Sequence, residues 1–451
     1  GFGIPGDYDS RLLQLVDGHR INDNIYNSLF NDHSLPVDID MIKRVEVVRG
    51  PSSSLYGSSA FFGVVNIITK QGRDIGGWEV SGAVGSHKSY QGRLSYGNRL
   101  GNGVELLLSG TLGDNEGKHR LYYPEFDDPA THNGIAEDMD GEAFKNLFAR
   151  VSWNDFTLEG GYGDREKAIP TGSYGTVFNA RESRTWDYRG FVDLKYQTLL
   201  DSGAELTARL FYDRYWYDGD YLYDYGDPGD PYIVINKDSA DGRWWGSELQ
   251  WNQRFGSHHL ILGAEYRDSI SEEQRNYDVD AVYLDSDSDT SVWAVYLQDE
   301  LNLWEGLILN LGLRHDHYSD FGNTTNPRAA LIWSPLDGTV LKLLYGEAFR
   351  APSAYERIYN DGGETQKPAR GLEPETISTV ELVLEQQLAA NLRGVASLYR
   401  NKIKDLIALD TDPVDDLLVF VNQGDAEAQG AELELERRWE GGATTSMSYS
   451  Y

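Results

Sequence analysis

The sequence predicts an all-β dominated protein, a transmembrane antiparallel β-barrel that follows a small α/β unit. Between residues 77 and 451, roughly 17 segments of about ten residues alternate apolar and polar side chains, as strands with one apolar face do. Their connections alternate between short turns and long acidic loops, which is the up-and-down arrangement of an outer-membrane barrel. Tryptophans stand near many segment ends, where their rings suit a membrane–water interface.

The first 74 residues have a different pattern. Residues 12–16, 42–48 and 64–69 are short apolar or β-branched strands, with a turn at Asp17-Gly18 and a break at Gly50-Pro51. We therefore expect one domain in 1–74 and the barrel in 75–451. Residues 1–10 lack the basic and apolar regions of a signal peptide, and residues 444–451 read as a strand cut in its middle. We expect a longer natural protein.

The alternation is clearest in residues 204–213 and 431–436. Leu206, Ala208 and Leu210 share one face, opposite Thr207 and Arg209. Short connections are expected at 99–103, 154–155, 199–202, 255–257, 304–306, 335–338 and 388–391, and long ones at 113–141, 164–184, 218–242, 269–291 and 349–374. The tryptophans in question are Trp78, Trp153, Trp216, Trp244, Trp245, Trp251, Trp304, Trp333 and Trp439. A soluble sandwich or propeller is the alternative, but the sequence shows no blade repeat.

Composition excludes several other classes. The chain has 451 residues, a net charge of −32 and no cysteine. The mean hydropathy is −0.51, and no apolar run approaches the ~20 residues of a spanning helix, so a helical membrane protein is excluded. The acidic balance argues against nucleic-acid binding, because phosphates need a basic surface. Without cysteine there is no disulfide, thiolate zinc site or cysteine nucleophile.

One stretch carries a specific resemblance. Residues 40–70 read DMIKRVEVVRGPSSSLYGSSAFFGVVNIITK, which strongly resembles the end of the plug domain of TonB-dependent outer-membrane receptors. Residues 13–18 (LQLVDG) are similar to an earlier plug element of that family. In the barrel, FRAP at 349–352, GLEPET at 371–376 and the stretch 423–434 resemble further family motifs. The resemblance therefore covers nearly the whole chain.

The resemblance implies an architecture and a function. The family has a barrel of about 22 strands filled by a plug, so this chain would hold the C-terminal part of the plug and a barrel incomplete at its C-terminus. It would be a monomeric outer-membrane receptor of a Gram-negative bacterium, in contact with outer-membrane lipid and energised by TonB with the inner-membrane ExbB/ExbD complex. A ferric siderophore is the first expected ligand and cobalamin the alternative. Haem is disfavoured. Haem receptors of this family place a histidine between the FRAP segment and the next proline-containing motif, and residues 351–372 contain none.

The resemblance also assigns roles to plug residues. It implies that Arg49 pairs with glutamates of the barrel wall, for which Glu434 and Glu436 are candidates; a solvated arginine at a strand end is the alternative. The plug motif itself comprises Gly50, Pro51, Leu55, Tyr56, Gly57, Gly63 and Asn66. We expect its glycines to allow tight turns or close backbone approach.

Two aromatic segments are candidates for ligand contact. Residues 22–32 occupy the position of the plug apex in the family and contain Tyr26, Asn27 and Phe30. Residues 217–232 form a tyrosine-rich segment with Tyr221, Tyr223 and Tyr225. Tyrosine can pack on a large ligand and hydrogen-bond to it. A simple exposed turn is the alternative for the first segment.

The same acidic segment suggests structural calcium, although no cofactor is required. Carboxylate oxygens are the ligands that Ca²⁺ prefers, and the candidates are Asp218, Asp220, Asp224, Asp227 and Asp230. Asp285, Asp287 and Asp289 have similar spacing but do not follow the EF-hand pattern, and solvated acidic loops are the alternative reading.

Enzyme signatures are missing from the sequence. It contains no Gly-x-Ser-x-Gly, and no histidine precedes a glutamate. An outer-membrane barrel enzyme or an adhesin is the alternative of a different class, and neither would need the plug motif. We therefore expect no enzymatic activity.

Overall fold

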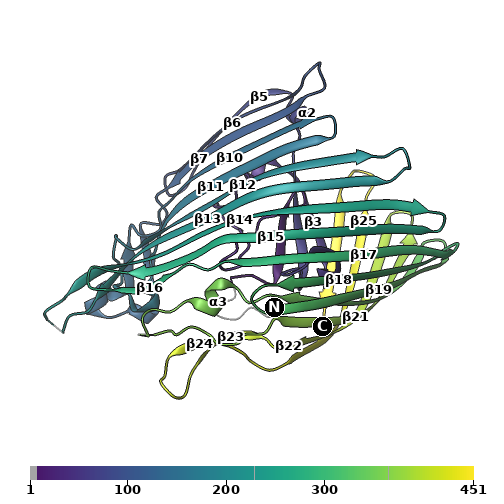
Figure 1. The fold of residues 1–451 in the computed structure, drawn as a ribbon. Helices are drawn as coiled ribbons and strands as arrows, with labels where there is room; N and C mark the ends of the chain where they lie inside the picture. The colour runs from purple at the N-terminus through teal and green to yellow at the C-terminus, as the bar shows by residue number, and fades with distance from the viewer. Residues whose placement is uncertain (1–7, 228, 364) are drawn as a thin grey trace.

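The chain folds into a small sheet enclosed by a large β-barrel (Figure 1). The computed structural model describes residues 8–227, 229–363 and 365–451. We call residues 8–76 the plug. Within the described residues, no helix is long and apolar enough to cross a membrane.

The plug contains a four-stranded sheet in the order β2-β1-β4-β3. Its strands are β1 (Leu12–Val16), β2 (His19–Arg20), β3 (Ile42–Arg49) and β4 (Gly63–Thr69), accompanied by η1 (Ile39–Met41), α1 (Ser53–Tyr56) and α2 (Gly72–Ile75). Strand β4 is rich in β-branched residues and lies centrally, parallel to β1 and antiparallel to β3. Helix α1 ends at Gly57, whose φ of 74° favours glycine.

Seventeen long strands of the described chain form the barrel, in agreement with the number of alternating segments. They are β5 (Gly77–Gly85), β6 (Ser89–Arg99), β7 (Glu105–Asn115), β10 (Glu142–Trp153), β11 (Phe156–Ala168), β12 (Arg184–Leu199), β13 (Glu205–Asp224), β14 (Ile233–Phe255), β15 (His258–Tyr277), β17 (Thr290–Trp304), β18 (Leu307–Tyr318), β19 (Gly322–Leu336), β20 (Thr339–Arg350), β21 (Glu375–Ala389), β22 (Leu392–Lys404), β25 (Ala426–Arg438) and β26 (Thr444–Ser450). Strands that follow one another in this order pair antiparallel.

Short elements lie in the long connections between barrel strands. We call the end of the barrel that carries these connections the outer end. The short elements are β8 (Arg120–Tyr122), β9 (Ile135–Glu137), β16 (Val282–Ser286), β23 (Ile407–Thr411), β24 (Leu418–Asn422), η2 (Pro124–Phe126), η3 (Pro129–Gly134), η4 (Ser173–Gly175) and α3 (Ala354–Ile358). Strand β16 pairs with β15, while β23 and β24 form a separate hairpin.

Two of the expected loops are in fact largely strand. Residues 218–242 and 269–291 were expected to be long connections, but β13, β14 and β15 continue into them. Strands β13 and β14 pair over their whole length up to the pair Asp224 and Ile233. Because each strand satisfies the backbone groups of its neighbour, the ladder persists where the side chains have become polar.

The two faces of the barrel strands agree with the alternation. On β13, Leu210 is 53% exposed on the outer surface, whereas Asp213 is 0% exposed and faces the plug. One tryptophan departs from the interface prediction: Trp244 is buried and faces inward, because it packs against the plug.

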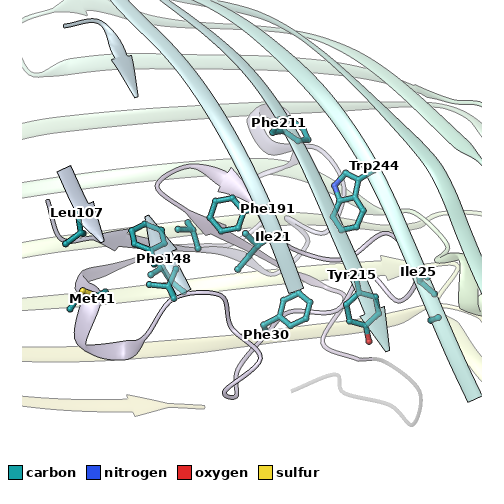
Figure 2. Packing of buried hydrophobic residues seen from close by; sticks show 14 residues of the cluster. Ile21, Ile25, Phe30, Met41, Leu107, Phe148, Phe191, Phe211, Tyr215 and Trp244 are labelled. Carbon is teal, nitrogen blue, oxygen red and sulfur yellow. The ribbon is translucent and has the colours of Figure 1, made fainter. Parts of the chain in front are cut away.

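The largest hydrophobic cluster is shared by the plug and the barrel wall (Figure 2). The plug contributes Val16, Ile21, Ile25, Phe30, Val37, Met41 and Ile67, and the wall contributes Leu107, Phe148, Phe191, Phe211, Tyr215, Ala240 and Trp244. Burial of apolar surface is the main stabilising contribution to such packing. The plug therefore does not complete this core by itself.

Candidate functional site

The apex of the plug is the loop that follows β2, and Asp23 organises it. The Asp23 carboxylate accepts hydrogen bonds from the backbone N–H groups of Ile25 (2.8 Å), Tyr26 (2.5 Å) and Ser28 (2.9 Å). Burial raises the pKa of Asp23, and these hydrogen bonds oppose that rise. The loop is thus folded around one side chain and presents Tyr26 to the outer end.

Tyrosines from three parts of the chain gather over this apex. We call Tyr26, Tyr215, Tyr217, Tyr221, Tyr355 and Tyr359 the tyrosine vestibule. The ring centroid of Tyr26 lies 6.0 Å from that of Tyr215 and 5.1 Å from that of Tyr355, which is 4.8 Å from that of Tyr359. The hydroxyls of Tyr217 and Tyr221 are hydrogen-bonded to each other. Aromatic rings at these separations attract one another and present both apolar faces and hydroxyl groups.

Helix α3 places Tyr355 against the plug. A capping box of Ser353 and Glu356 starts the helix, and the Tyr355 N–H donates to the Ile25 carbonyl at 3.0 Å. Burial raises the pKa of both Tyr26 and Tyr355, so both phenols remain protonated at neutral pH.

The structure separates the predicted ligand residues. Tyr26 and Tyr221 belong to the vestibule, and Asn27 lies beside it with its amide 3.5 Å from the Ala351 carbonyl. Tyr223 and Tyr225 stack on each other near the outer end of β13, with centroids 5.7 Å apart. Phe30 (6% exposed) and Tyr215 (5% exposed) are both core residues, so Phe30 is not the exposed ligand contact that we expected, and Tyr215 joins the vestibule only through its ring contact with Tyr26.

Four vestibule residues were not predicted as ligand contacts, namely Tyr215, Tyr217, Tyr355 and Tyr359, although Tyr217 begins the predicted tyrosine-rich segment 217–232. Tyr355 follows the FRAP segment at 349–352 by three residues, and this spacing is the signal that could have identified it. Tyr215 belongs to the inward face of β13, but alternation alone does not show that the plug apex lies beside it.

A polar cavity of about 60 Å³ lies beside the plug apex. Arg20, Asn24, Glu272 and Arg357 are among its lining residues. Arg357 pairs with Glu272 at 3.2 Å, and Arg20 donates to the Tyr56 carbonyl at 2.6 Å. Burial lowers the pKa of Arg20 to about 10, which still leaves it charged at neutral pH.

Arg49 forms an ion pair across the boundary between plug and wall. Its Nη1 atom is 2.8 Å from Glu434 Oε1 and 3.9 Å from Glu432. Glu436, the other candidate, pairs with Arg438 instead. The Arg49 side chain is 75% exposed and borders a cavity of about 380 Å³, so the pair is an open one.

Buried ion pairs add further plug–wall contacts. Arg11 of the plug donates to Glu375 at 2.8 Å, and Arg350 donates to the same carboxylate at 2.8 Å. Arg350 and Glu375 belong to the FRAP and GLEPET segments, so these two barrel segments meet at a plug arginine. On the other side, Asp213 of the wall accepts from Arg189 at 2.6 Å and contacts His19 at 3.0 Å.

Comparison with known families decides the relationship. Residues 140–451 match the family described as "TonB dependent receptor-like, beta-barrel", and residues 1–64 match the "TonB-dependent Receptor Plug Domain". The chain belongs to the TonB-dependent receptor family. These proteins are transport receptors of the Gram-negative outer membrane rather than enzymes, and they bind siderophores and interact with TonB.

Solved structures of siderophore receptors and of an iron transporter share the fold. A mutant of the ferric enterobactin receptor PfeA of Pseudomonas aeruginosa, in a complex with enterobactin, has 21% identity and a TM-score of 0.73, over 98% of this chain and 73% of that one. The siderophore receptor PirA of Pseudomonas aeruginosa has 20% identity and a TM-score of 0.67, over 98% and 77%. The FrpB iron transporter of Neisseria meningitidis has 17% identity and a TM-score of 0.71, over 98% and 72%.

The plug motif of this TonB-dependent receptor maps onto contacts around α1. The Arg314 guanidinium of β18 donates to the Leu55 carbonyl at 3.0 Å, and a Cβ atom at Gly57 would lie 2.9 Å from Arg314. A side chain at Gly63 would meet the Val48 carbonyl at 2.6 Å. These glycines permit close approach, as expected.

The remaining motif residues have structural positions as well. Asn66 accepts from the Gly18 N–H at 3.1 Å, and Tyr56 offers its carbonyl to Arg20. Gly50 has a φ of 83°, and Pro51 lies beside Gly346 of β20.

The predicted calcium ligands of this receptor are not gathered. Asp218 and Asp220 lie on β13, where Asp220 pairs with Lys237 at 2.7 Å. Asp224 accepts from the Gly226 and Tyr232 N–H groups, while Asp227 and Asp230 form a tight turn. In the described part of the chain, no three acidic or histidine side chains converge as a metal site requires.

Proposed function

We propose that this receptor lies in the outer membrane, binds a ferric siderophore at its outer end and imports it into the periplasm. The tyrosine vestibule over the plug apex is the observation that carries this proposal, because it joins loop and plug side chains in one site. Ligand bound there would contact the plug directly, so occupancy could alter the plug. The named functions of the similar structures, which include a siderophore receptor and an iron transporter, support the same ligand class.

The proposal includes the partners that transport needs. An outer membrane has no ATP supply, so we propose that TonB, with the inner-membrane ExbB/ExbD complex, provides the energy. The barrel would act as a monomer with its apolar outer face in outer-membrane lipid, and the net charge of −32 argues against nucleic acid as a partner. The import cycle needs no cofactor, and structural calcium is not part of the proposal because the five aspartates lie apart.

Equilibrium binding to the complete receptor in detergent tests the ligand class. We expect binding of at least one ferric siderophore and no binding of haem or cobalamin. Tyr355→Ala should weaken siderophore binding at least about tenfold, because it removes a central aromatic contact. Tyr122→Ala is the matched control, since Tyr122 is exposed on β8 and lies outside the vestibule. Binding of cobalamin alone, or equal effects of the two substitutions, would contradict the proposal.

A further inference from the structure

The electrostatic character of the vestibule is set by carboxylates. Asp238, on the inward face of β14, accepts a hydrogen bond from the Tyr359 hydroxyl at 2.6 Å and one from the Asn276 amide at 3.2 Å. Both partners are neutral, so the negative charge of Asp238 is not balanced by them. Asp23 is bound in the same way, by backbone N–H groups and the Ser28 hydroxyl.

The hairpins that surround the vestibule add charge of the same sign. Residues 215–232, 277–291 and 405–425 contain 16 aspartates and no lysine or arginine. The first of these segments includes Tyr215, Tyr217 and Tyr221, and the third includes Phe420, which lies 5.7 Å from the Tyr355 ring. An approaching ligand therefore passes a negatively charged rim before it reaches the tyrosine rings.

Three cations near the vestibule do not offset this charge, because each is paired with at least two carboxylates. Arg165 pairs with Asp32 and Glu142, Arg357 pairs with Glu272 and Asp320, and Lys367 pairs with Asp412 and Asp415. Arg20, in the adjoining cavity, donates instead to the carbonyls of Tyr56 and Ser58 within the plug.

Aromatic faces combined with carboxylates favour positive charge in a ligand. The ring quadrupole attracts cations, and a desolvated carboxylate attracts them more strongly. Ferric chelates differ in charge by ligand chemistry. Three singly charged hydroxamates neutralise Fe³⁺, and a pendant amine then makes the complex a cation. Three doubly charged catecholates instead leave a trianion.

We infer that the vestibule selects a neutral or cationic ferric chelate, of the hydroxamate type with a pendant amine, over polyanionic chelates. This inference rests on the proposed siderophore function and specifies its substrate class. It follows from the unbalanced carboxylates, the aromatic walls and the ion pairs of Arg165, Arg357 and Lys367, all within the described residues.

A charge series on one chelate tests the inference. The probes are a ferric linear trihydroxamate with a free amine, its N-acetyl form and its N-succinyl form, which carry charges of +1, 0 and −1 but share the iron centre. We expect affinity for the complete receptor in detergent to fall roughly tenfold per unit of charge at low salt, and the spread to narrow in 0.5 M salt. Equal affinities, or tightest binding of the succinyl form or of a ferric tris-catecholate, would overturn the inference.

Matched variants test whether the vestibule carboxylates cause the charge dependence of the affinity. Asp238→Asn keeps an acceptor for Tyr359 but removes the charge, so the ratio of affinities between the +1 and −1 probes should fall about fivefold. Asp201→Asn makes the same change on the exposed turn at the opposite end of the barrel and should leave the ratio unchanged. Asp187, on the inward face of β12, is the third carboxylate around Arg165, at 3.7 Å; if Asp238→Asn does not fold, Asp187→Asn replaces it. Equal ratios in wild type and the folded vestibule variant would overturn the assignment to these carboxylates.

The binding data distinguish failure of the siderophore function from failure of the charge selectivity. If no ferric chelate of any charge binds, the siderophore function fails and this inference falls with it. If ferric chelates bind without regard to charge, the function stands and only the inference falls.

Discussion

Burial separates the ion pairs bordering the plug that stabilise the fold from those that contribute little. Arg189 and Asp213 are both fully buried, and Arg189 also donates to the Ile21 carbonyl at 3.0 Å and lies over the Trp244 ring. Removing one partner of such a pair leaves an uncompensated buried charge. The Arg49–Glu434 pair is exposed and screened, so water can replace it at little cost. Arg49 is thus better suited to release than to anchorage.

We expect Arg189→Ala to destabilise the plug by about 3–5 kcal/mol, because Asp213 loses its cation in a buried setting. Arg214→Ala is the matched control on the neighbouring strand, where an exposed arginine pairs with Asp241, and it should cost only about 0–1 kcal/mol. Hydrogen exchange of residues 12–30 in detergent measures the free energy of opening. Similar losses for both variants would contradict the buried-pair argument.

Among the outer elements, the β23–β24 hairpin is held against residues 365–367 by backbone hydrogen bonds and by ion pairs. The Lys367 N–H donates to the Leu418 carbonyl at 3.0 Å, and the Leu418 N–H donates to the Thr365 carbonyl at 2.8 Å. The Lys367 ammonium contacts Asp415 at 2.8 Å and Asp412 at 2.5 Å. Phe420 reaches Tyr355, so the hairpin forms one side of the vestibule.

Docking of this hairpin should depend on pH in a definite direction. The Lys367 ammonium lowers the pKa of Asp412, so the contribution of the pair is present above the ordinary value of 3.8 and is lost as pH falls through the lowered value. Hydrogen exchange of residues 412–416 should therefore stay slow at pH 4 and accelerate only in stronger acid. Lys367→Met should accelerate exchange already at pH 6. Unchanged exchange in that variant would show that backbone contacts alone hold the hairpin.

For the whole molecule, the shared hydrophobic core couples the plug to the barrel. Seven plug residues and seven wall residues form one cluster, so neither part buries these side chains without the other (Figure 2). If the proposed import passes a large ligand between plug and wall, this contact must open. The plug must then move relative to the wall or rearrange within it.

A disulfide crosslink between plug and wall tests whether the plug must move. Because the chain has no native cysteine, only the introduced pair can form a disulfide. A Cβ atom at Gly312 would lie 3.6 Å from the Ser54 Cβ, which suits a disulfide between β18 and α1. We expect Ser54→Cys/Gly312→Cys to bind ligand normally, to lose uptake when oxidised and to regain it with reductant. Gly85→Cys/Ser89→Cys, at 3.4 Å within one hairpin of the wall, is the control and should transport in both states. Full uptake through the oxidised plug–wall crosslink would contradict plug movement at this contact.

Much of the fold could be predicted from the sequence, because period-two alternation reports directly which face of a strand meets lipid. Leu210 and Asp213 lie on the faces that their positions predict. The motif at 40–70 likewise identified the plug. Alternation does not show where a strand leaves the membrane, which is why β13 and β14 exceed their expected ends.

The vestibule was only partly predictable, because it depends on which inward positions of distant strands meet the plug apex. Tyr26 and Tyr221 stood out by local composition, whereas Tyr215 looks like any inward aromatic residue. Phe30 shares its segment with Tyr26 but points into the core, and nothing in the local pattern separates the two.

The parallel pairing of β1 with β4 has a mechanical consequence. Five residue pairs join the two strands, from Leu12 with Gly63 to Val16 with Ile67. A pulling force that enters the sheet at Leu12 and leaves through the far end of β4 toward β5 acts along the strands. The ladder is then loaded in shear, so its hydrogen bonds share the tension instead of unzipping one at a time. Such a sheet resists traction until the ladder slips as a unit, so the peak force matters as much as the work done.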